Sequence, residues 1–149
     1  MASANPARNP PNDTEATSVA RALRLESFFP EFTGPLCSKI FPRSGVSVYA
    51  AGDFVIEQGE SGRDLFVLLE GSVSVTLSMG SAGAEVATLG AGALIGEVAL
   101  LRDGLRSASA VAIVETRAFR LMFEDMGYIL QHNPELAAHL RGLAQARTS

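Results

Sequence analysis

The sequence is poor in cysteine and has no tryptophan: Cys37 is the one cysteine among 149 residues. One cysteine cannot form an internal disulfide, and no second cysteine supplies the spacing of a metal site. We therefore expect Cys37 to be a packed thiol in a reducing, intracellular setting. The expected location is the cytoplasm.

Long apolar runs are also missing. The longest, around GALIGEVALL, contains Glu97 and is too short to cross a bilayer, so no membrane span is expected. The first 18 residues, MASANPARNPPNDTEATS, have no apolar core next to basic residues and do not form a signal peptide.

Positive charge is scarce, with 12 Lys and Arg residues against 16 Asp and Glu residues and a net charge of -4. This balance argues against a surface that binds DNA, RNA or an anionic membrane. Any nucleotide bound by this chain is expected to be small. Hydrophobic residues make up 47% of the chain, which is enough for one compact domain of this length.

The chain divides into a short tail and one domain. Residues 1–16 are rich in Pro, Asn, Ala and Ser, so we expect a disordered tail there and a single domain over residues 17–149. A helix is predicted from Thr17 to near Pro30, followed by a helical turn containing Leu36 and Ile40. After Gly45 the apolar residues alternate with polar ones, as in DLFVLLEGSVSVTLSM, and glycines separate many short strands.

The C-terminal part returns to helical spacing. Asn133, Pro134 and Glu135 combine an N-cap residue, a first-turn proline and a first-turn acid, and apolar residues then recur at 136, 140 and 143. The sequence therefore predicts a mainly β fold, a barrel or sandwich, with helices on both flanks.

The strand pattern breaks in LIGEVALLRDGLRSASA, residues 94–110, and this stretch is the candidate site. A short helix opening after Gly96 would direct the backbone N–H groups near Val98 and Ala99 at one anion. Arg106 supplies a forked cation suited to two phosphate oxygens, whereas Glu97 is an acceptor suited to a ribose hydroxyl. One arginine with oriented amides matches a singly charged phosphodiester better than a triphosphate.

This stretch could also belong to another kind of phosphate site, to a structural turn or to an enzyme. The spacing fits neither a P-loop nor the glycine pattern of a dinucleotide-binding fold. Glu97 and Arg106 could instead form a structural ion pair at a turn. No metal ligands and no nucleophile with a paired base are evident, so we expect no enzymatic activity, no metal and no cofactor.

The stretch IGEVALLRDGLRSASA resembles the phosphate-binding cassette of cyclic nucleotide-binding domains, F-G-E-[LIV]-A-L-[LIV]-x-x-x-x-R-[ST]-A. The upstream segment AGDFVIEQGESGRDLFVLLEGSVSV is similar to the strands that precede that cassette, and the likeness covers residues 20–146. Ile95 and Leu105 depart from the usual Phe and Pro. The resemblance implies an eight-stranded β-roll with N-terminal helices and a C-terminal lid helix, which acts as a regulatory sensor.

The resemblance also implies roles for individual residues. Arg106 would hold the cyclic phosphate, Glu97 the ribose 2'-OH, and the amides of Ala99 and Ser107 the remaining oxygens. The cassette and the base-wall positions together give the implied ligand site: Gly96, Glu97, Val98, Ala99, Arg106, Ser107, Ala108, Val75, Val86 and Ala87. On the lid helix, Arg141 or Arg147 could reach the purine.

The expected ligand is cAMP, with cGMP as the alternative, because Ser107 stands where a threonine often accompanies cGMP preference in the family. The expected partners are the cyclic nucleotide and a protein effector, and the oligomeric state stays open. Two other interpretations remain: a β-roll that serves as an interaction scaffold without ligand, and the sensor domain of a transcription regulator or nucleotide-gated channel.

Overall fold

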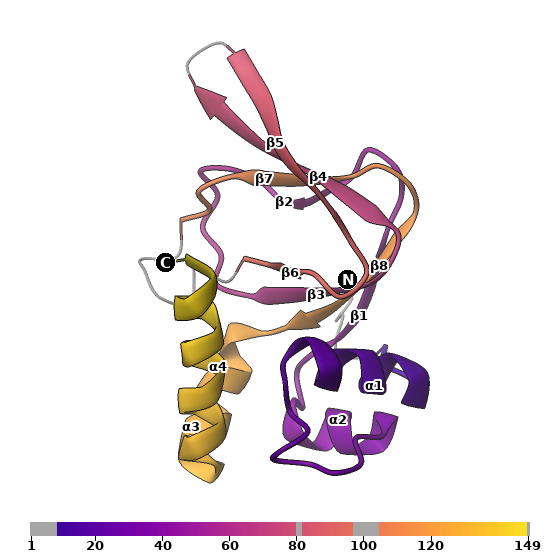
Figure 1. Ribbon diagram of the computed structural model, residues 1–149, viewed down its shortest axis with the longest axis vertical. Coiled ribbons are helices and arrows are strands. Elements are labelled where there is room, and N and C mark those ends of the chain that lie inside the picture. The colour runs from indigo at the N-terminus through magenta and orange to yellow at the C-terminus, as the bar shows by residue number, and fades with distance from the viewer. Residues whose placement is uncertain (1–8, 80–81, 97–104, 149) are drawn as a thin grey trace.

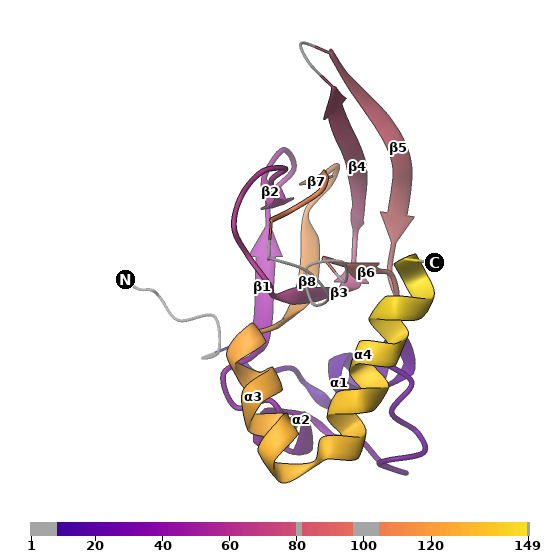
Figure 2. The same cartoon turned by 90° about the vertical axis from the view of Figure 1, so that its left-hand side faces the viewer.

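The computed structural model describes residues 9–79, 82–96 and 105–148. Within these residues, two four-stranded antiparallel sheets form a roll, and four helices lie at one end of it (Figure 1). The expected β-roll with flanking helices is confirmed. The hairpin of β4 (Ser72–Met79) and β5 (Ala82–Gly90) projects beyond the roll at the end opposite the helices (Figures 1 and 2).

The first sheet has the strand order β1-β8-β3-β6 and the second the order β2-β7-β4-β5. The strands of the first sheet are β1 Gly45–Tyr49, β8 Thr116–Leu121, β3 Leu65–Glu70 and β6 Leu94–Ile95. Those of the second sheet are β2 Phe54–Ile56, β7 Ser109–Ala112, β4 Ser72–Met79 and β5 Ala82–Gly90. Each sheet pairs strands from the beginning of the β region with strands from its end. The segment that precedes β7 therefore lies beside residues between β2 and β3.

The helices are α1 Asp13–Ala22, α2 Gly34–Ile40, α3 Phe123–His132 and α4 Pro134–Thr148. Thr33 caps α2 through its side chain, which accepts a hydrogen bond from the Leu36 amide. The predicted start of α4 is confirmed, because the Asn133 side chain accepts a hydrogen bond of 3.1 Å from the Leu136 amide.

Two predictions at the N-terminal end are wrong. Helix α1 begins at Asp13, four residues before the predicted start, because Asn12 and Glu15 form a reciprocal capping box. The proposed tail over residues 1–16 is therefore too long, although residues 1–8 lie outside the described residues. The helix also ends at Ala22, well before Pro30, because Arg24 adopts a left-handed conformation with φ 54°.

Two groups of buried side chains form the interior. The base core packs the helices against the first sheet and is rich in aromatic residues, with Phe41 and Phe119 fully buried and their rings 5.9 Å apart. The roll core lies between the two sheets and uses smaller side chains: Val55, Ile56, Phe66, Leu68, Val73, Ile95, Ala110 and Ala118.

Buried polar groups tie the helices to the strands. Asp125 of α3 is fully buried and accepts hydrogen bonds from the Arg43 amide and from the Ser44 hydroxyl, the latter at 2.6 Å. Burial raises the pKa of this carboxyl above its ordinary value, although the hydrogen bonds act in the opposite direction. On the other side of the molecule, Glu15 of α1 pairs with Arg117 of β8 at 2.7 Å.

Cys37 lies in the base core, free and fully buried, as expected for a packed thiol. Burial, with a smaller contribution from Asp125, raises its pKa to about 12. A thiol in this environment stays protonated at neutral pH and is a poor nucleophile.

Candidate functional site

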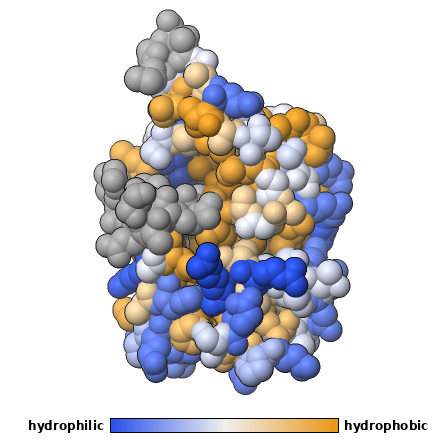
Figure 3. Space-filling view, viewed as in Figure 1, coloured by the Kyte–Doolittle hydropathy of each residue, from blue (hydrophilic) through white to orange (hydrophobic). Residues whose placement is uncertain are grey.

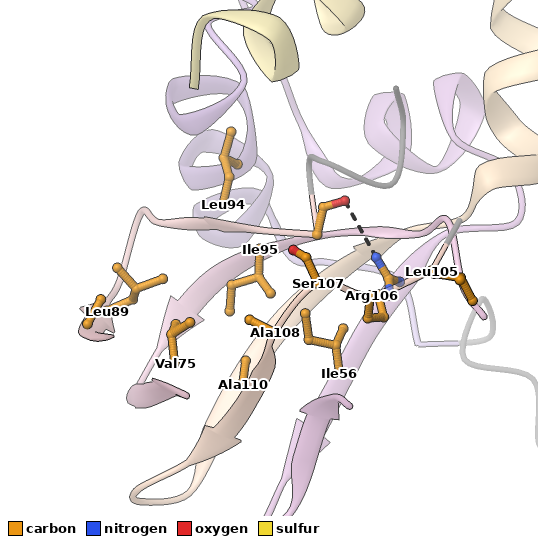
Figure 4. A pocket seen from close by; sticks show the side chains of 12 residues that line it. Ile56, Val75, Leu89, Leu94, Ile95, Leu105, Arg106, Ser107, Ala108 and Ala110 are labelled. Carbon is orange, nitrogen blue, oxygen red and sulfur yellow. Dashed lines mark hydrogen bonds between the residues drawn. The ribbon is translucent and has the colours of Figure 1, made fainter. Parts of the chain in front are cut away.

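A cavity of about 250 Å³ opens between the two sheets of the roll. Its lining comes from both sheets and from the segment that leads into β7: Ile56, Val75, Ala87, Leu89, Leu94, Ile95, Gly96, Leu105, Arg106, Ser107, Ala108 and Ala110. Figure 4 shows Arg106 and Ser107 on one side of this cavity and Val75 and Leu89 on the other. One side is therefore charged and polar, whereas the other is apolar.

Arg106 is the buried cation of the cavity, with 7% of its surface exposed. Its backbone is fixed by two hydrogen bonds of 2.9 Å, one from its amide to the Glu60 carbonyl and one from the Gly59 amide to its own carbonyl. The early loop before β3 thus determines where the guanidinium lies.

The guanidinium of Arg106 donates to two backbone carbonyls, that of Asp64 at 3.0 Å and that of Gly96 at 3.5 Å. Figure 4 shows the second of these bonds. Burial lowers the pKa of the guanidinium below its usual value, an effect that nearby Asp64 opposes. Within the described part of the chain, Arg106 has no salt bridge to a carboxylate, in contrast to Arg117 and Arg120. The cavity therefore holds a buried positive charge that an anion would neutralise.

Two glycines make room for this guanidinium. A Cβ atom on Gly96, whose φ is 90°, would lie 2.7 Å from the Nη1 atom of Arg106 and 2.8 Å from the Asp64 carbonyl oxygen. A Cβ atom on Gly62 would lie 3.1 Å from the Nη2 atom. The sequence interpretation treated Gly62 as a turn glycine only, and its role against Arg106 emerges from the packing.

Asp64 connects the cavity to α3. Its backbone carbonyl accepts from Arg106, as described above, while its carboxylate accepts from the Phe123 amide at 2.7 Å and from Arg120 Nε at 2.7 Å. Phe123 is the first residue of α3, and Met122 before it provides no side-chain cap. A carboxylate at this end is favourable because the first helical amides lack partners within the helix. Sequence reasoning missed Asp64 because its partners lie 42 to 59 residues away.

The predicted site residues divide into three groups. Gly96, Arg106, Ser107 and Ala108 meet at the cavity with the predicted base-wall residues Val75 and Ala87. Glu97, Val98 and Ala99 lie outside the described residues, so their predicted roles stay predictions. In the third group, Val86 and Arg141 do not line the cavity among the described side chains, whereas the side chain of Arg147 lies outside the description and its predicted role stays a prediction.

Val86 is a correction to the sequence interpretation. A bulge in the β4–β5 pairing places Ala87 opposite Val75 and Glu85 opposite Thr76, so Val86 has no partner in register. Its side chain is 59% exposed and is absent from the cavity lining. Successive side chains of a strand face opposite sides of the sheet, and of this adjacent pair Ala87 is the one that lines the cavity.

Among the side chains of α4 that the structure describes, residues 134–143, none lines the cavity. Leu136 and Leu140 of α4 are buried in the base core, and His139 places its Nε2 atom 2.9 Å from the Leu23 carbonyl oxygen. Arg141 is exposed, and Arg147 belongs to the last turn of the helix.

Two negative findings apply to the described residues. None of their helices is long and apolar enough to cross a membrane. They also contain no group of three or more His, Cys, Asp and Glu side chains placed to hold a metal ion.

A β-roll with a buried arginine beside an apolar slot defines a class of small-anion receptor domains. The family model described as cyclic nucleotide-binding domain matches residues 46–133. The chain therefore belongs to the cyclic nucleotide-binding domain family.

Known proteins similar to this chain include receptors and channels. The cyclic AMP receptor protein of Thermus thermophilus is 35% identical over 101 residues, which are 67% of this chain and 47% of that protein. The human cyclic nucleotide-gated channel beta-1 is 37% identical over 101 residues, which are 66% of this chain and 8% of the channel. The chain thus spans about half the length, or much less, of these relatives.

The fold is also similar to solved structures. A cyclic nucleotide-binding domain from Methylobacillus flagellatus superposes with a TM-score of 0.73 at 25% identity, over 91% of this chain and 79% of that one. The regulatory domain of Toxoplasma gondii PKA, solved with cAMP, has a TM-score of 0.68 at 18% identity, over 90% of this chain and 48% of that one. At that identity the second likeness concerns the fold alone.

Proposed function

We propose that this chain is a regulatory sensor that binds a cyclic nucleotide, with cAMP preferred over cGMP, in the cavity at Arg106. The observation that carries the proposal is the buried guanidinium, which has backbone carbonyls as its hydrogen-bond acceptors and faces a cavity with an apolar far wall. A cyclic phosphodiester supplies the missing charge, and its purine fits the side of Val75, Ala87 and Leu89.

The residues outside the described part complete the proposed site. Glu97 would accept the ribose 2'-OH, and the amide of Ala99 would contact the phosphate together with that of Ser107. We expect Ser107 to favour cAMP over cGMP, as the family resemblance implies. A buried, unpaired thiol at Cys37 supports a reducing, cytoplasmic setting.

The proposed output is a movement of α4. Cyclic nucleotide would favour a state in which α4 lies over the purine, because that state alone adds contacts from Arg141 or Arg147 to the ligand. The link from Arg106 through Asp64 to the first turn of α3 supports this mechanism, since α3 is joined directly to α4. An effector protein would respond to the new position of the helix.

Titration calorimetry with cAMP and cGMP tests the site. Arg106→Ala should weaken cAMP binding ~10- to 150-fold, about 1.5 to 3 kcal/mol, because it removes a charge-assisted hydrogen bond. Arg117→Ala is the matched control, since Arg117 pairs with Glu15 away from the cavity and its loss should leave affinity unchanged. Unaltered cAMP affinity in Arg106→Ala would overturn the site, and tighter cGMP than cAMP binding would overturn the preference.

A thermal shift measurement separates a sensor from a ligand-free scaffold. Cyclic nucleotide at 100 times its dissociation constant should stabilise the protein by about 2.7 kcal/mol. For the lid movement, Arg141→Trp introduces a single tryptophan, whose emission should change when cAMP is added. Binding without any change in that emission would contradict the movement of α4.

A further inference from the structure

A second cavity, of about 620 Å³, lies on the other side of β6 from the nucleotide cavity. The end of α1, the turn that follows it, β3, the turn before β6 and α4 all contribute to its wall. Leu94 of β6 lines both cavities. A molecule in the second cavity would therefore contact the wall of the first.

Two arginines, Arg21 and Arg24, stand at this cavity, and both are exposed. Neither has a hydrogen bond or salt bridge from its side chain to any described residue, whereas Arg117 and Arg120 each pair with a carboxylate. In a chain with a net charge of -4, two free cations at one cavity are a local excess of positive charge. Figure 3 shows a strongly hydrophilic area over this part of the molecule, next to an apolar one.

Arg24 reaches the cavity from the turn that ends α1. This turn is a Schellman motif, in which the Leu25 amide donates to the Ala20 carbonyl at 2.8 Å and the Arg24 amide to the Arg21 carbonyl at 3.3 Å. The motif requires a left-handed residue at this position, which accounts for the φ of 54° at Arg24. Arg24 therefore contributes to the cavity through its exposed charge, as Arg21 does.

Part of the cavity wall is apolar. It includes Leu69 of β3, Leu94 of β6 and Leu143 of α4, of which Leu69 and Leu143 are partly buried. Exposed arginines bind a small inorganic anion weakly, because water and salt screen them. Useful affinity requires an occupant that also covers these leucines. An acidic peptide segment with an apolar side chain meets both requirements.

From this geometry we infer that the second cavity is a docking site for an acidic segment of a partner protein, with carboxylates at Arg21 and Arg24 and an apolar residue against Leu69, Leu94 and Leu143. The docking does not depend on nucleotide binding. Its regulation does rest on the proposed function, because Leu143 belongs to α4 and Leu94 to the wall of the nucleotide cavity.

Fluorescence anisotropy with a synthetic probe tests the docking. The probe is a fluorescein-labelled nonapeptide of alternating glutamate and leucine, and the control peptide has glutamine in place of glutamate. Wild-type protein should bind the acidic probe saturably and more weakly as salt is raised. The double variant Arg21→Gln with Arg24→Gln should bind it at least tenfold more weakly. Lys39→Gln, which removes an exposed cation on α2 away from this cavity, should bind like wild type.

The variant Arg24→Gly separates loss of binding from loss of folding. Glycine accepts the left-handed conformation, so this protein should melt at or above the wild-type temperature and yet bind the probe several-fold more weakly. Absence of saturable binding to wild type, equal binding of the glutamine peptide, or undiminished binding by the double variant would each overturn the proposal. Sedimentation that shows a dimer lost in the double variant would assign the surface to a second copy of this chain and overturn it as well.

Loss of nucleotide binding and loss of probe binding can be distinguished. Arg106→Ala should lose cAMP affinity and keep probe binding, because Arg106 does not line the second cavity. Probe binding that disappears in Arg106→Ala would contradict an independent docking site.

Discussion

The base core and the roll core differ in the size of their side chains and in how completely they are packed. The base core is filled by large side chains, including Phe41 and Phe119, around helices whose buried carboxylate, Asp125, accepts hydrogen bonds from two donors, the Arg43 amide and the Ser44 hydroxyl. The roll core has smaller side chains and leaves a cavity that contains a buried cation, which donates hydrogen bonds to two backbone carbonyls and forms no salt bridge within the described residues. The contrast indicates that stability is concentrated at the base and that the roll keeps space and charge for a ligand.

The largest predicted effect is on the base core. Phe119→Ala should lower the free energy of unfolding by about 3 to 5 kcal/mol, because it leaves a cavity in a fully packed region. Leu89→Ala, at the partly buried wall of the nucleotide cavity, should cost less than about 1.5 kcal/mol, since that side chain already borders empty space. Urea denaturation measures both free energies of unfolding. Equal losses in the two variants would contradict the difference in packing between the base core and the roll core.

A smaller effect is expected at the glycine beside Arg106. Gly96→Ala adds a clash with Arg106 and Asp64 to the cost of a left-handed alanine, so it should destabilise by about 2 to 3 kcal/mol and weaken cAMP binding. Gly52→Ala is the control, because its φ is 93° but nothing lies within 4 Å of the added Cβ atom. It should cost about 1 to 2 kcal/mol and leave binding unchanged. A Gly96 variant no worse than the Gly52 variant would show that close packing against the guanidinium is unimportant.

The smallest effect concerns the buried carboxylate of the base core. Burial raises the pKa of Asp125 in the folded state, so the folded protein holds this proton to a higher pH than the unfolded chain does. The associated stability is present below the ordinary pKa of 3.8 and is lost as the pH rises through the raised value. It amounts to ~1.4 kcal/mol for each unit of difference. Asp125→Asn should lack this slope when urea unfolding of both proteins is followed from pH 3.5 to 7, and parallel curves would contradict the assignment.

Local signals in the sequence predicted the elements that depend on neighbouring residues. The start of α4 follows from Asn133 and Pro134, and the strands follow from alternation and glycine spacing. The capping box of Asn12 and Glu15 was also visible in the sequence, but the polar composition around it led to the wrong tail boundary. Helix α3 was not predicted at all, because its first amide is capped by Asp64, the residue before β3, rather than by its own N-cap residue.

In the candidate site, too, the sequence predicted features that depend on neighbouring residues and missed those that depend on distant contacts. The order and spacing of Gly96, Arg106, Ser107 and Ala108 identified the charged side of the cavity. Val75 and Ala87 line the cavity and Val86 does not, since successive side chains of a strand face opposite sides of the sheet. Contact of these residues with a purine stays a prediction. The support of Arg106 by Gly62 and by the Asp64 carbonyl depends on packing between distant segments, and no short motif encodes it.

A substitution at Asp64 would affect its two hydrogen-bonding roles differently. Its support of Arg106 comes from a main-chain oxygen that almost any residue would present, whereas its hold on α3 and Arg120 comes from the carboxylate. A point mutation at position 64 can therefore change how firmly the helical end is attached while the anion receptor keeps its shape. Under the proposed mechanism, substitutions at this position would adjust the size of the response separately from the affinity for the ligand.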